Sequence, residues 1–228
     1  MTTMAGFATV LRKDLRLELR GGESTIALLA LSLLVMVVLV FALDASRVRG
    51  VDTAAGALWV AMVFSGMLGA GRALLAERDN GCIRGLLLSP LEAATLYAAK
   101  LAAALIFMLV AEVGAVVLMV LFFNLEFSSA LMRVAPIVML GALGFAAVAT
   151  LLSAITSRTR AGDMLLPILA VPMFTPALIA GVKASGAALA GASFGAMADW
   201  IKIMIAFDVL FVTAGYLLFE HVVGQGQD

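Results

Sequence analysis

The alternation of hydrophobic and polar segments along the chain predicts six membrane-spanning α-helices. Each hydrophobic segment is close to the ~20 residues that a helix needs to cross a bilayer. The connections between them are short, so residues 1–228 are expected to form a single transmembrane domain. In chain order, the predicted spans are residues 24–43, 53–71, 91–123, 134–157, 164–182 and 200–219.

The N-terminal residues 7–20 have a different pattern from the spans. Apolar side chains lie near one face of a helix, namely Phe7, Val10, Leu11, Leu15 and Leu19. Most charged side chains lie away from that face, with Arg12, Lys13, Arg16 and Arg20 interleaved with Asp14 and Glu18. This pattern predicts a basic amphipathic helix that lies in the membrane interface.

The longest polar interruption, residues 77–100, lies between the second and third predicted spans. Ile83, Leu86 and Leu87 are spaced to share one face of a short helix over residues 81–88. Charge flanks this face at Glu77, Arg78, Asp79 and Arg84. The stretch is interpreted as a surface helix that docks another molecule, and the alternative is a solvated connector.

Helix ends are signalled less strongly than helix interiors. At the third span, Ser89 is expected to cap the helix, with Pro90 in the first turn and Glu92 as the capping-box partner. Asp199 is placed to cap the sixth span. The Gly- and Ala-rich segment 183–198 fits a loop, a re-entrant segment or a broken extension of the fifth span.

Composition supports an all-α integral membrane protein. Hydrophobic residues make up 64% of the chain and charged residues 13%, against about 25% charged in soluble domains. The net charge of zero gives no indication of a nucleic-acid partner. One Cys and one His argue against a His/Cys metal site. No phosphate-binding P-loop sequence is present, so any ATPase must be another chain.

The distribution of Lys and Arg predicts the orientation. With the N-terminus in the cytoplasm, ten of the fifteen Lys and Arg residues fall on the cytoplasmic side. The positive-inside rule therefore favours both termini and the 77–100 stretch in the cytoplasm.

Two acidic residues and three prolines interrupt the predicted spans. Glu112 lies in the middle of the third span and Asp208 lies inside the sixth. Such carboxylates either line a functional pathway or make a packing hydrogen bond to a neighbouring helix. Pro167, Pro172 and Pro176 make the fifth span a candidate hinge or pathway element. Small residues suited to close helix packing are Gly66, Gly69, Gly71, Gly141 and Gly144.

Three stretches resemble the CcmB family, the haem exporter subunits among the type-2 ABC exporters. The first runs from Ala57 through Trp59 to Leu74, in the second predicted span. The second is 77–90, which is similar to the family's coupling helix. The third is the proline-bearing 165–182. The resemblance covers nearly the whole chain and places it in the bacterial inner membrane.

The resemblance implies partners and a substrate. A CcmA-like ATPase would dock on Ile83, Leu86, Leu87 and their flanking charges, so ATP would be bound by that partner and this chain would not be catalytic. The other implied partners are CcmC-like, CcmD-like and CcmE-like proteins, and ATP hydrolysis would release the haem-loaded CcmE-like chaperone. ABC transporters have two nucleotide sites, which implies two copies of this chain or one beside another membrane subunit.

Two alternatives remain at the level of sequence. A generic type-2 exporter of a drug, lipid or glycan would share the spans and the docking helix. An ion-coupled carrier or intramembrane enzyme would use Glu112 and Asp208 and would need no ATPase.

Overall fold

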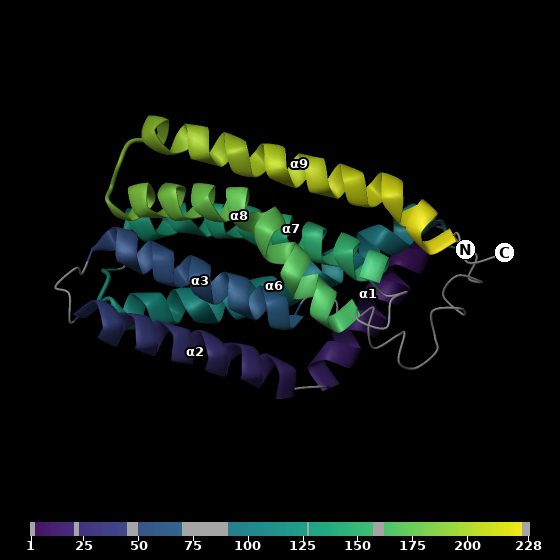
Figure 1. The fold of residues 1–228 in the computed structure, drawn as a ribbon, viewed down its shortest axis with the longest axis horizontal. Helices are drawn as coiled ribbons and strands as arrows, with labels where there is room; N and C mark the ends of the chain where they lie inside the picture. The colour runs from purple at the N-terminus through teal and green to yellow at the C-terminus, as the bar shows by residue number, and fades with distance from the viewer. Residues whose placement is uncertain are drawn as a thin grey trace.

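The protein is a helical bundle in its computed structural model, which describes residues 3–20, 23–44, 50–69, 91–126, 128–156 and 162–224. These residues form helices and contain no strand (Figure 1). The helices are α1 (Thr3–Arg20), α2 (Glu23–Asp44), α3 (Val51–Gly69), α6 (Ala93–Phe122), α7 (Ser129–Thr156), α8 (Gly162–Leu189) and α9 (Phe194–Gly224). The predicted all-α class is confirmed.

Four of these helices are long and apolar enough to cross a membrane, namely α6, α7, α8 and α9. Two shorter apolar stretches are Ala30–Ala42 in α2 and Val51–Met67 in α3. Large apolar side chains are exposed along the outer helices, as expected for a surface that faces lipid. The chain is therefore an α-helical membrane protein.

Helix α7 occupies the centre of the bundle. In its most apolar window 83% of the residues are buried, a larger share than in α6, α8 or α9. It packs against α6, α8 and α9, and small residues allow the close approach. A Cβ added at Gly141 would meet the Trp59 ring of α3, and one added at Gly144 would lie 2.5 Å from Asp208 Oδ1 of α9.

Helix α8 is held in the bundle by a stripe of small side chains. Its buried small residues at helical spacing include Ala170, Ala177, Gly181, Ala184 and Ala188, and the larger Phe174 lies on the same stripe. The helix changes direction part-way along its length (Figure 1). Prolines are the usual cause of such a bend, because each lacks the N–H of one helical hydrogen bond.

The segment 183–198, which the sequence left open, is mostly helical. Helix α8 runs to Leu189, a turn follows with Gly191 at φ +72°, and α9 begins at Phe194. Arg133 Nη1 of α7 donates to the carbonyl of Ala192 at 2.9 Å, which satisfies a backbone acceptor in this connection. The fifth predicted span thus continues unbroken, and small residues at Ala184 and Ala188 keep its extension packed.

Two capping predictions were wrong. Glu92 is itself the N-cap of α6, in an extended conformation and without a side-chain capping bond. Leu91, which precedes this N-cap, packs beside Gly6 of α1. Asp199 lies inside α9, where it pairs with Lys202 at 2.8 Å, because the helix begins five residues earlier. Ser89 and Pro90 lie outside the described residues.

Candidate functional site

At one end of the bundle, α1 meets the beginning of α6 and the end of α9. A buried apolar cluster joins them through Val10, Leu96, Tyr97 and Phe219. The centroids of the Tyr97 and Phe219 rings are 5.5 Å apart. This cluster lies where the described chain resumes after residues 70–90, which contain the predicted docking segment.

A buried ion pair crosses the same junction. Asp14 Oδ2 of α1 lies 2.9 Å from Lys100 Nζ of α6, and the two side chains are 1% and 2% exposed. Lys13 Nζ approaches the other carboxylate oxygen at 3.2 Å. Separating a buried pair leaves uncompensated charge in a medium of low dielectric constant. Helix α1 is therefore fastened to α6, the first described helix after the predicted docking segment.

Glu112 makes a polar contact between α6 and α3. The Ser65 hydroxyl donates to Glu112 Oε1 at 3.3 Å, and the carboxyl group is almost fully buried. The same hydroxyl lies 2.9 Å from the Ala61 carbonyl, so its single hydrogen is shared between acceptors. Glu112 Oε2 has no hydrogen-bond partner among the described residues. The geometry is that of an interhelical hydrogen bond.

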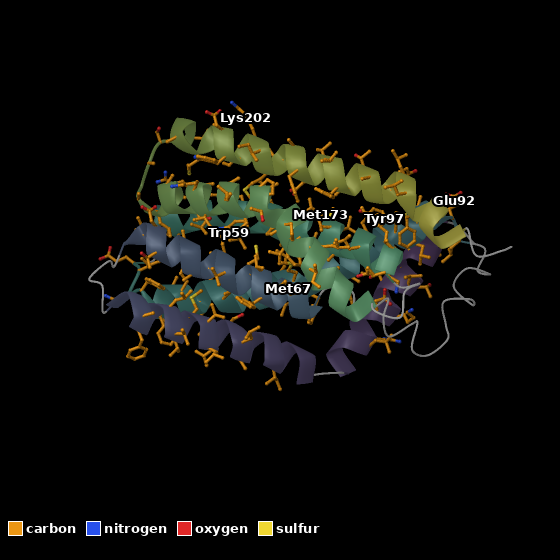
Figure 2. The ribbon with its side chains drawn as sticks, in the orientation of Figure 1. Trp59, Met67, Glu92, Tyr97, Met173 and Lys202 are labelled. Carbon is orange, nitrogen blue, oxygen red and sulfur yellow. The ribbon has the colours of Figure 1, made fainter. Side chains whose placement is uncertain are left out.

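Asp208 of α9 is buried against the backbone of α7. Gly144 makes room for it, since any Cβ there would come to 2.5 Å from Asp208 Oδ1. Lys202, the nearest cation on α9 in sequence, points outward from the bundle and pairs with Asp199 (Figure 2). The missing side chain of Gly144 in the adjacent helix thus leaves the space that the Asp208 carboxylate occupies.

Packing through α7 links the surroundings of Glu112 to those of Asp208. Gly144 faces Asp208, and the next residue, Phe145, packs against Gly66, which follows the Glu112 partner Ser65. Within the described part of the chain, no hydrogen bond or ion pair joins the two carboxylates. Each acid thus contacts a different helix, and the structure does not bring them together as a pair.

A chain of aromatic rings runs through the same layer. Phe174 of α8 lies 4.9 Å from Phe145, 5.9 Å from Phe207 and 6.4 Å from Trp59, measured between ring centroids. Trp59 Nε1 donates to Ser185 Oγ at 3.0 Å, which satisfies the buried indole N–H. The rings connect α3, α7, α8 and α9 in one hydrophobic core, and Trp59 of this core is labelled in Figure 2.

Comparison with known protein families identifies the family of this helical bundle. The family model described as CcmB protein matches residues 5–223, which is nearly the whole chain and includes most or all of each described helix. The chain belongs to the CcmB family. This confirms the resemblance seen in the sequence and makes the chain a membrane subunit of the ABC transporter of haem export in cytochrome c maturation. A search of curated proteins found no match.

The docking surface expected for a CcmB family subunit stays a prediction. Its residues, Glu77, Arg78, Asp79, Ile83, Arg84, Leu86 and Leu87, all lie outside the described residues. The elements that flank them are described, since α3 ends at Gly69 and α6 begins at Ala93.

Two of the three prolines in α8 of this CcmB family member lie on the outside of the bundle. Pro172 and Pro176 are exposed, while Phe174 between them is buried in the aromatic core. Thr175 Oγ1 donates to the Val171 carbonyl at 2.9 Å, next to the hydrogen bonds that the prolines interrupt. Pro167 lies within α8 by its backbone, and its side chain is outside the described set. Exposed prolines fit the hinge role better than the pathway role, because residues that line a pathway would face the interior of the bundle.

Sequence reasoning missed the Asp14–Lys100 pair. Asp14 was counted with the polar face of its helix, and Lys100 was counted as a cation of a cytoplasmic connection. The spacing contained a signal, because Asp14 is seven residues after Phe7 and four after Val10, on the apolar stripe. Lys100 likewise follows Leu96 and Tyr97 at helical spacing. When the apolar faces of two helices each carry one charge of opposite sign, a buried ion pair between the helices is indicated.

Proposed function

We propose that this chain is the membrane-embedded subunit that couples a partner ATPase to haem delivery for c-type cytochromes. The CcmB family match over residues 5–223 is the observation that carries this proposal. In the proposed topology the chain crosses the bacterial inner membrane six times, with both termini in the cytoplasm. The long apolar helices α6 to α9 support four of these crossings.

In this proposal a CcmA-like ATPase docks on the segment around Ile83, Leu86 and Leu87. Closure of the ATPase on ATP displaces this segment and pulls on the start of α6. The buried Asp14–Lys100 pair transmits the displacement to α1. Separating α1 from α6 would leave each of the two buried charges without its partner, which is costly. The proline-bearing α8 absorbs the movement by bending.

Haem is the substrate of the assembly in this proposal. The chain acts with CcmC-like and CcmD-like membrane proteins, and ATP hydrolysis releases the haem-loaded CcmE-like chaperone. Two copies of the chain are expected in each complex to match two nucleotide sites. ATP is bound by the partner subunit, so this chain contributes movement and not catalysis.

Complementation tests this function directly. The gene is expressed in a bacterium that lacks its own CcmB family gene, and covalent haem in c-type cytochromes is measured on a haem-stained gel. Restored staining is the expected result. A protein that inserts and captures an ATPase but gives no staining, even with its native operon, would favour a generic type-2 exporter. Loss of both staining and ATPase capture would favour the carrier that uses Glu112 and Asp208.

A further inference from the structure

A hollow lined by exposed basic residues lies along α1. Arg12 and Arg16 are one helical turn apart and both exposed, so their guanidinium groups start from neighbouring positions. They border a cavity of ≈ 670 Å³. Its described lining comes entirely from α1 and consists of Ala8, Thr9, Arg12, Lys13, Arg16 and Leu17.

This face is positive because the acidic residue of the same turn points the other way. Asp14 is buried and paired with Lys100 of α6, and Lys13 leans toward that carboxylate. Among the residues that the structure describes, no ion pair engages Arg12 or Arg16. The exposed part of α1 therefore carries Arg12 and Arg16 without an acidic ion-pair partner among the described residues.

With α6 to α9 crossing the membrane, as proposed above, α1 lies at the level of the lipid headgroups. Helix α1 packs on the beginning of α6 and lies at the end of the bundle (Figure 1). Only two residues separate its end at Arg20 from the start of the apolar α2 at Glu23. Leu17, beside Arg16, is 54% exposed, and Met4 at the other end of α1 is 82% exposed. Apolar side chains beside exposed cations fit the boundary between headgroups and acyl chains.

We propose that the Arg12–Arg16 face of α1 binds the phosphate headgroup of an anionic phospholipid. Guanidinium groups recognise phosphate through paired, charge-assisted hydrogen bonds. A leaflet that contains anionic lipid attracts such a basic segment, whereas zwitterionic lipid does not. The exposed Leu17 side chain lies against the acyl chains of the same lipid. This inference concerns the described residues and does not depend on the proposed haem pathway.

Lipid binding to the purified full chain tests the proposal. Phosphatidylglycerol or phosphatidylcholine is titrated into the detergent-solubilised protein, and bound lipids are counted by native mass spectrometry. The wild-type chain should bind phosphatidylglycerol more tightly. Arg12→Gln with Arg16→Gln should weaken that binding about fivefold per charge removed. Lys202→Gln, which removes an exposed cation elsewhere, should leave it unchanged.

Several outcomes would overturn this assignment. Equal binding of both lipids, or unchanged phosphatidylglycerol binding in the double variant, would do so. Displacement of the lipid by equimolar glycerol phosphate would assign the hollow to a free phosphate compound. Unchanged lipid binding with lost ATPase capture would assign the face to the ATPase. If the double variant does not insert, a salt series on the wild-type protein decides, since a preference that does not fall with salt contradicts the proposal.

Discussion

Asp14 of α1 and Lys100 of α6 form a buried ion pair with 2.9 Å between Oδ2 and Nζ. The pair fastens the N-terminal helix to the first described helix after the predicted docking segment. It contrasts with the Asp199–Lys202 pair, which has a similar distance of 2.8 Å but side chains that are 84% and 74% exposed. The two pairs provide a matched comparison of buried and exposed charge.

Asp14→Asn is expected to lower the free energy of unfolding by about 3–5 kcal/mol, because it leaves Lys100 charged and buried. Asp199→Asn should change the stability little, because exposed ion pairs contribute little. Thermal unfolding in detergent measures both. Asp14→Leu with Lys100→Met should be more stable than Asp14→Asn alone, since apolar replacements remove the charges together. Equal losses for Asp14→Asn and Asp199→Asn would contradict the structural role of the buried pair.

Gly181→Ala should destabilise the bundle by about 1–3 kcal/mol through overpacking. A Cβ at this position of α8 would overlap the buried Trp59 ring, and the ring is also held by its hydrogen bond to Ser185. Gly56→Ala is the control, because nothing lies within 4 Å of a Cβ there. The control should be neutral or slightly stabilising, since glycine weakens a helix interior. Thermal unfolding of the two variants measures the difference. Equal stability would contradict the predicted overlap and would show that the Trp59 ring can move aside.

The double variant Glu112→Gln, Asp208→Asn should retain haem attachment near the wild-type level. An amide at residue 112 still accepts the Ser65 hydrogen bond, and an amide at residue 208 still fits the notch beside Gly144. Haem-stained gels of the complemented strain measure the effect. Lost staining at unchanged protein abundance would instead support the carrier that uses both acids.

Leu86→Asp with Leu87→Asp should abolish capture of the partner ATPase while the chain still inserts. Charge on the apolar face of the predicted docking helix cannot be buried against the partner without a large desolvation cost. Met132→Asp is the control, because Met132 is an exposed apolar residue in the first turn of α7. Affinity capture from solubilised membranes provides the measurement. Full ATPase capture by the Leu86, Leu87 variant would refute docking at this surface.

Sequence periodicity predicted the helices more accurately than their ends. The apolar runs around Glu112 and Asp208 were each assigned to a helix, and α6 and α9 contain them. The ends differed from the local signals. Glu92 is an N-cap without a side-chain capping bond, and α9 starts at Phe194, ahead of the capping signal at Asp199.

The sequence by itself determined the class of the protein, because an apolar segment in lipid must satisfy its backbone hydrogen bonds internally as a helix. It also determined the family, through stretches such as the one around Trp59. Only the tertiary structure decided the partners of the buried polar groups. Asp14 pairs with Lys100, Glu112 accepts a hydrogen bond from Ser65, and Asp208 packs against Gly144. In each case the two residues come from helices that the fold brings together. Local spacing gives the direction of a side chain on its helix, and the packing of the bundle selects the helix that it faces.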